Sequence, residues 1–145
     1  MPVDVRPAVT VRRSPGEVAA YMFDPAHDME WTGGITASHP DQPGRLHVGS
    51  AVTREARFLG RRFRYRYVVT SAAGDHLEMT VDRPFPMTIR YELEPTADGT
   101  RVAIHAVGDP GRFFGWATPL MRRQVQRSIR ADLERLRHRL EPPGG

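Results

Sequence analysis

Residues 113–140 read FFGWATPLMRRQVQRSIRADLERLRHRL, the longest stretch of the chain in which apolar residues keep a helical period. At 100° per residue, most apolar side chains fall on one stripe and most arginines on the opposite side. The stripe consists of Phe114, Thr118, Met121, Val125, Ile129, Leu133, Leu136 and Leu140. This pattern predicts an amphipathic helix that needs an apolar partner surface. Thr118-Pro119 marks either its start, with Thr118 as N-cap, or a kink after a short leading turn, and we favour the start.

The composition limits which kinds of protein this chain can be. With 145 residues it is long enough for one domain with a substantial core, expected at 1–141, followed by a disordered tail at 142–145. There is no cysteine, and all 21 basic residues are arginine. Thiolate chemistry, cysteine-ligated metals and lysine Schiff bases are therefore excluded. An arginine-only composition is typical of a GC-rich bacterial genome.

The formal net charge is +4, which raises the question of a nucleic acid or anionic membrane partner. Because 17 acidic residues are interleaved with the bases, a solvated arginine surface is the simpler interpretation. We expect no specific nucleic-acid binding. The first residues lack the apolar core of a signal peptide, and no run approaches the ~18 apolar residues of a membrane span. We expect a soluble cytoplasmic protein, monomeric or homodimeric.

The first 34 residues predict one strand and two short helices. Val3, Val5, Val9 and Val11 alternate with polar residues, as in a half-buried strand. Ser14-Pro15-Gly16-Glu17 reads as a capping box that opens a helix, which should stop at Asp24-Pro25. A short turn through Trp31 then ends at Gly33-Gly34.

The middle of the chain predicts a meander of strands. Residues 35–45 should be a loop or a short edge strand, and alternation predicts strands at 46–59, 62–71, 76–82, 87–93 and 100–107. The short turns between them require antiparallel pairing. One face is apolar and the other rich in arginine, so only one side should be covered. We therefore expect an α+β fold, with a curved antiparallel sheet of about six to seven strands wrapped around the C-terminal helix.

The order of these elements resembles the START-like or SRPBCC superfamily, and within it the bacterial polyketide cyclase/dehydrase and lipid-transport proteins. The residues that carry the resemblance are Ser14-Pro15-Gly16-Glu17-Val18, Asp24-Pro25, Trp31, Phe58-Leu59-Gly60-Arg61-Arg62 and Asp132-Leu133-Glu134-Arg135-Leu136. The likeness covers nearly the whole chain. It implies a helix-grip fold with a hydrophobic cavity between the sheet and the C-terminal helix. It implies no single reaction, because the superfamily includes binders, transporters, cyclases and stress-response proteins.

Aromatic and methionine side chains on the expected inward faces suit an adaptable apolar ligand, although they could equally fill the core. The candidate ligand contacts are Trp31, Phe63, Tyr65, Tyr67, Met79, Phe85, Met87, Tyr91, Phe114, Met121 and Val125. Trp31 is alternatively a structural plug under the first helices. Phe85 lies between two prolines and is a candidate gate of the cavity.

The residue types that remain for chemistry are tyrosine, aspartate, histidine and arginine. The six histidines show no metal-ligand spacing, and nucleotide-binding and serine-hydrolase motifs are absent, so we expect neither metal nor cofactor. Tyr65, Tyr91 and Asp132 are candidate acid–base or orienting groups, with Arg54 as an oxyanion partner.

Two of these candidates have alternative interpretations. Ser50 and Arg54 share the parity of Val52 and Phe58 and would point inward, unless a bulge turns them out. Asp132 falls on the buried stripe, where desolvation would raise its pKa, but it could instead form an ion pair with Arg135 or Arg139 at the surface edge.

The sequence leaves two functions open, with a third as a weaker alternative. The chain is either a carrier of a hydrophobic molecule such as a lipid, isoprenoid or polyketide, or a cofactor-free cyclase or dehydratase that folds a polyketide-like chain in the same cavity. The weaker alternative is a protein-interaction module that uses the arginine-rich face.

Overall fold

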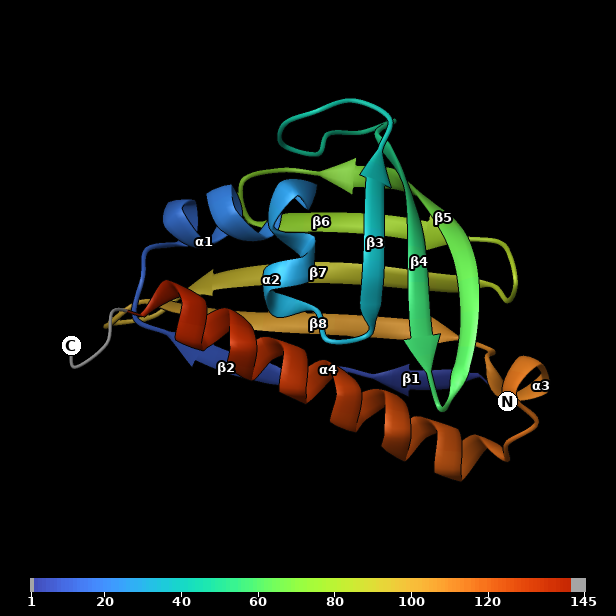
Figure 1. Cartoon of the computed structure of the whole chain (residues 1–145). Coiled ribbons are helices and arrows are strands. Elements are labelled where there is room, and N and C mark those ends of the chain that lie inside the picture. Colours follow the sequence, from blue (N-terminus) through green and yellow to red (C-terminus); the bar gives the residue numbers. More distant parts are fainter. Residues whose placement is uncertain (1, 142–145) are drawn as a thin grey trace.

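In the computed structural model, the described residues 2–141 form an antiparallel sheet of eight strands that curves around a long C-terminal helix (Figure 1). The structure describes residues 2–141, and the tail predicted at 142–145 lies outside the described residues. The strands are β1 (Val3–Val5), β2 (Ala8–Val11), β3 (Ile35–Pro40), β4 (Ala51–Phe58), β5 (Arg61–Ala72), β6 (His76–Val81), β7 (Met87–Pro95) and β8 (Thr100–Gly108). The helices are α1 (Pro15–Met22), the 3-10 helix η1 (Pro25–His27), α2 (Asp28–Trp31), α3 (Gly111–Phe114) and α4 (Thr118–Leu140). The predicted helix-grip fold is confirmed.

The strand order is β1-β8-β7-β6-β5-β4-β3, and β2 also pairs with β8, so β1 and β2 together form one edge and β3 forms the other. The single strand predicted at the N-terminus is split at Arg6-Pro7. Its register on β8 nevertheless continues, since Val5 pairs with Ala106 and Ala8 with Ala103. The break occurs because Pro7 has no backbone N–H to donate, although its carbonyl accepts from Ile104.

The opposite edge strand, β3, is irregular. It pairs antiparallel with β4, but the register shifts between Ile35 and Ala37, and the strand ends at Pro40. The sequence left a loop or a short edge strand open for this region, and the structure forms the edge strand.

The start predicted for the strand at 46–59 is wrong, because β4 begins only at Ala51. Residues 46–50 form a turn in which Gly49 has a φ of 91° and the Ser50 hydroxyl accepts from the His47 backbone. A positive φ breaks the extended geometry that a strand requires. The parity argument therefore fails for Ser50, whereas it holds for Arg54, which is buried within β4.

Both helix starts follow the sequence signals closely. Ser14 and Glu17 form the predicted capping box of α1. Helix α4 starts at Thr118, as expected, but its N-cap residue is Ala117 and not Thr118. The preceding turn is the separate helix α3, so α4 has a true start there.

Helix α4 lies along β1, β2 and α2 and covers the concave face of the sheet (Figure 1). Met121, Leu133 and Leu136 of its apolar stripe are fully buried. Inward residues of β5 to β8 form the main core together with α1 and Trp31. Along β5, β6 and β8 they alternate with half-buried or exposed residues, except at Ala103, which is also buried. Among the helices of the described chain, none is long and apolar enough to cross a membrane.

Candidate ligand-binding cavity

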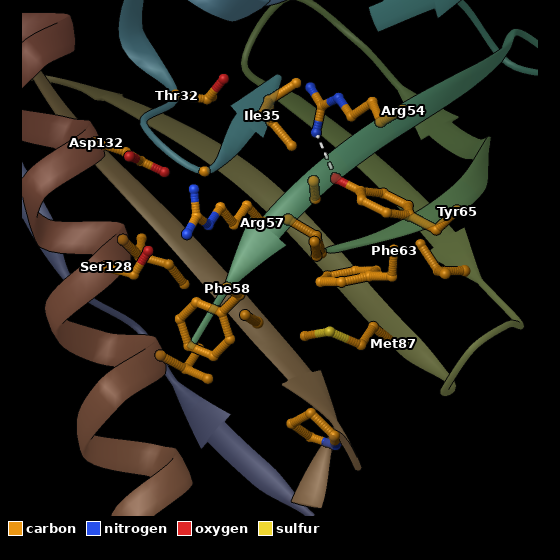
Figure 2. Close-up of a pocket in the computed structure, with 18 of the residues that line it drawn as sticks. Thr32, Ile35, Arg54, Arg57, Phe58, Phe63, Tyr65, Met87, Ser128 and Asp132 are labelled. Carbon is orange, nitrogen blue, oxygen red and sulfur yellow. Dashed lines mark hydrogen bonds between the residues drawn. The ribbon is translucent and has the colours of Figure 1, made fainter. Parts of the chain in front are cut away.

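A cavity of about 190 Å³ lies between the concave face of the sheet and α4 (Figure 2). The side chains around it are mostly apolar. They come from strands β3 to β8, from helices α2, α3 and α4, and from the segments before β3, between β6 and β7 and after β8. The sheet does not close onto α4 here, because α4 packs directly against β1 and β2 at one edge and against α2. The curvature of the sheet therefore leaves a space between strands and helix.

One end of the cavity is lined by phenylalanine rings. Five of the six phenylalanines meet here, with ring centroids 4.9–6.0 Å from their neighbours in this group or from Tyr65. The rings are those of Phe58, Phe63, Phe85, Phe113 and Phe114, and we call this group the phenylalanine cluster. Phe113 is its one member that does not line the cavity. Because such rings attract one another without hydrogen bonds, the cluster forms an apolar wall.

The other end is polar and is organised by Arg54, whose side chain is only 5% exposed. Its Nε and Nη2 atoms both reach Asp28 Oδ2, at 3.1 Å and 2.8 Å, and its Nη1 donates to the Tyr65 hydroxyl at 3.1 Å. Ser38 donates to the same Asp28 oxygen at 2.7 Å. This network links α2 to β3 and β4. A buried arginine stays protonated, and its charge is stable there only when it is paired with a carboxylate and hydrogen-bond acceptors. Figure 2 shows the Arg54–Tyr65 bond at the cavity wall.

The remaining tyrosines near Arg54 are more deeply buried. Burial raises the pKa of Tyr91, and the neighbouring Arg54 opposes that shift, so this phenol is neutral at physiological pH. Burial likewise raises the pKa of Tyr67, whose ring lies 4.8 Å from the Arg54 guanidinium. The Tyr67 hydroxyl and Trp31 Nε1 are buried and have no hydrogen-bond partner among residues 2–141. Trp31 lines the cavity and packs edge-on against Tyr91.

Asp132 lies on α4, at the opposite wall from Tyr65, and points toward the sheet (Figure 2). Its side chain is 17% exposed. Oδ1 accepts from the Gly33 backbone at 2.9 Å and from Arg135 at 2.6 Å. Desolvation raises the pKa of Asp132, although the bonds from Gly33 and Arg135 pull it down in part. Both interpretations of this residue hold at once, since it is paired with Arg135 and also forms part of the cavity wall.

The structure brings most of the predicted site residues together. The candidates in the cavity wall are Arg54, Tyr65, Tyr91, Asp132, Trp31, Phe63, Phe85, Met87, Phe114 and Val125. Tyr67, Met79 and Met121 lie instead in the packed core and do not line the cavity. They share the inward face with the lining residues, but other side chains fill the space in front of them.

Sequence reasoning missed several residues of the site. Asp28, the partner of Arg54, lies three residues before Trp31, so both side chains fall on one face of a helix. This spacing was the available signal that Asp28 faces inward together with Trp31. Ser128 also lines the cavity, one helical turn before Asp132. Arg57 is exposed at the cavity and points from β4 toward α4 in Figure 2. No cluster of three acidic or histidine side chains suited to a metal occurs within the described part of the chain.

Comparison with solved structures shows that the fold recurs widely. Protein CV1439 from Chromobacterium violaceum is 19% identical, with 97% of this chain and 98% of that chain covered and a TM-score of 0.75. TTHA0849 from Thermus thermophilus is 14% identical, with 94% and 96% covered and a TM-score of 0.79. StfQ, the di-domain ARO/CYC from the steffimycin biosynthetic pathway, is 13% identical over 97% of this chain but only 51% of its own length, with a TM-score of 0.78. At these identities the similarity shows a shared fold alone.

The sequence itself identifies the family. No curated protein matches it. Residues 2–141, which are all the residues that the structure describes, match the family described as polyketide cyclase/dehydrase and lipid transport. The resemblance to the START-like superfamily is thereby confirmed, and the chain belongs to the polyketide cyclase/dehydrase and lipid transport family.

Proposed function

We propose that the chain binds a hydrophobic small molecule, polyketide-, lipid- or isoprenoid-like, that carries at least one carbonyl or hydroxyl oxygen. The observation that carries this proposal is the Arg54–Tyr65 pair in an otherwise apolar cavity wall. Because the Tyr65 oxygen already accepts a bond from Arg54, its own proton is available for an acceptor in the cavity. A charged donor on a phenol oxygen also polarises the phenol, which strengthens the bond that the phenol donates.

The volume of the cavity constrains the ligand. About 190 Å³ is less than the roughly 300–1,000 Å³ of pockets that hold drug-sized molecules. The ligand is therefore a compact molecule, or a longer one that displaces rings of the phenylalanine cluster. Its oxygen lies at Tyr65 and its apolar part extends toward Phe63, Met87 and Phe114.

Binding is tested by native mass spectrometry of the freshly purified chain and by titration with a neutral naphthol-type fluorescent probe, which carries one hydroxyl. We expect saturable binding that Tyr65→Phe weakens by about 2- to 10-fold, the equivalent of one hydrogen bond. Tyr21→Phe is the matched control, because the Tyr21 hydroxyl donates to Glu30 and does not line the cavity. Absence of saturable binding, or equal loss in both variants, would contradict the proposal.

Acid–base catalysis in the same cavity is a second candidate, favoured by Asp132. A carboxyl group with a raised pKa exchanges protons more effectively near neutral pH. In a cyclase-type reaction, the Asp132 carboxylate would take a proton from a methylene beside a carbonyl. Tyr65 would hold the enolate oxygen while the enolate carbon attacks a second carbonyl of the same chain, and the alkoxide formed there would take the proton back from Asp132, which regenerates the carboxylate.

Kinetics separate the enzyme from the carrier. With a short poly-β-ketone as substrate, Asp132→Asn should lower turnover by about 100-fold and leave probe affinity nearly unchanged if Asp132 moves the proton. Ser128→Ala, one turn away on the same wall, is the matched control. Turnover equal to wild type in Asp132→Asn would show that Asp132 does not move the proton, whereas wild-type turnover no faster than the uncatalysed reaction would leave the carrier function as the remaining interpretation.

A further inference from the structure

One end of the molecule gathers exposed apolar side chains and arginines outside the cavity. It is formed by residues 58–62, 82–86 and 109–123, which we call the α3 end. These segments are in contact, since Phe58 packs on Phe114 at 5.3 Å and Phe85 on Phe113 at 5.6 Å. The Arg61 guanidinium also lies 3.7 Å from the centroid of the Phe113 ring. Figure 1 shows α3, the β4–β5 turn and the start of α4 at the same corner of the fold.

The α3 end holds the charge excess of the chain. Its segments contain six arginines and two aspartates, a net charge of +4 that equals the formal net charge of all 145 residues. The other residues are thus balanced as a whole. Four of these arginines, Arg62, Arg83, Arg112 and Arg123, are exposed and have no acidic partner within residues 2–141. Unpaired charges of one sign on a single surface attract an anionic partner.

Two large apolar side chains protrude between these arginines. Trp116 is 38% exposed and Leu120 is 51% exposed, on the connection between α3 and α4 and the first turn of α4. The chain turns there through Gly115, whose φ is 72°. Trp116 and Leu120 do not line the cavity, and both side chains are exposed to solvent. An exposed tryptophan and leucine within a basic surface is the composition of segments that lie in the headgroup region of a membrane.

We propose that the α3 end docks on a bilayer that contains anionic phospholipid. The arginines contact the charged headgroups, while Trp116 and Leu120 enter the apolar layer beneath them. An acidic protein surface would pair with the arginines but would offer no such layer to the two apolar side chains. Docking does not depend on what the cavity holds. It does place Phe85 and Phe114 next to the bilayer, so an apolar molecule could pass between cavity and membrane without crossing water.

Vesicle flotation tests the docking. We expect the protein to bind vesicles that contain phosphatidylglycerol and not vesicles of phosphatidylcholine alone, and high salt should weaken the binding. Fluorescence reports the contact site, because the chain has two tryptophans and Trp31 is only 1% exposed. Brominated lipids should therefore quench Trp116 and leave the Trp31 emission.

Paired variants locate the surface. Trp116→Ser with Leu120→Ser, and separately Arg112→Gln with Arg123→Gln, should each weaken vesicle binding by about tenfold or more. Val48→Ser and Arg101→Gln are matched controls, because both side chains are exposed and lie outside the α3 end. Binding of the neutral cavity probe should be the same in all variants, which separates a failure of docking from a failure of ligand binding.

Three results would overturn the proposal. The first is no binding to phosphatidylglycerol vesicles at low salt. The second is an equal loss of binding in the control variants. The third is salt-sensitive binding to immobilised polyglutamate without any binding to vesicles, which would assign the surface to an acidic protein.

Discussion

The two ends of the cavity are built from different kinds of interaction. At the polar end, Asp28, Ser38, Arg54 and Tyr65 are joined by hydrogen bonds of 2.7–3.1 Å, and each bond fixes a direction. At the other end, the phenylalanine cluster is held by ring contacts that several arrangements satisfy almost equally well. From this difference we propose a division of roles, in which the polar end orients a ligand and the cluster controls its access.

The largest expected effect tests the rigidity of the polar end. Arg54→Met leaves the Asp28 carboxylate buried without its main partner and should lower the free energy of unfolding by about 3–5 kcal/mol, measured by urea denaturation. Combining it with Asp28→Asn should restore part of the loss, because the buried charge is then gone. At the other end, Phe114→Leu should cost less than ~1.5 kcal/mol. Similar losses at both ends would contradict the greater rigidity of the polar end.

A smaller effect is expected on the rate at which ligand enters and leaves. Phe85 contacts the rings of Phe63, Phe113 and Phe114, and each such pair contributes about 0.5–1.5 kcal/mol. Phe85→Leu should therefore speed the exchange of the cavity probe by about tenfold in stopped-flow fluorescence. The affinity of the variant for the probe should change less than the association and dissociation rates. Unchanged rates would show that access lies elsewhere.

The smallest effect concerns pH and Asp132. Desolvation raises the pKa of Asp132 in the folded chain, so its contribution favours folding below the ordinary pKa and is lost as the pH rises through the folded value. Replacement by a neutral amide removes that loss. The difference in Tm between Asp132→Asn and wild type should thus be more positive at about pH 7 than at about pH 4. A difference of opposite sign would mean that the bonds from Gly33 and Arg135 outweigh desolvation.

The fold was predictable because its signals are local and repeated. The helical period of α4, the capping box of α1 and the alternation in β5 to β8 each agree with the structure. The errors occur where a single residue determines the boundary of a strand. Pro7 splits the first strand, and Gly49 shifts the start of β4 to Ala51. The alternation of apolar residues predicts neither change.

The site was less predictable, for a physical reason. The odd or even position of a residue along a strand predicts which face of the sheet its side chain is on, but not which other side chains pack against it. Tyr65 and Tyr67 share a face of β5, yet only Tyr65 lines the cavity, whereas Tyr67 is 1% exposed in the packed core. The Asp28–Arg54 pair joins residues 26 positions apart, and it depends on how α2 packs over the sheet, which the sequence pattern does not specify.

The positions of two prolines bear on how the protein behaves at high concentration. An open sheet has two edges whose unpaired N–H and C=O groups can add a strand from another chain. Here Pro7 interrupts one edge and Pro40 ends the other, which the register shift between Ile35 and Ala37 also distorts. A proline offers no N–H donor, and a bulge turns the backbone away from straight pairing. The prolines and the register shift thus limit edge-to-edge aggregation at both edges, and on β3 they add to the protection from α2, which packs against this strand.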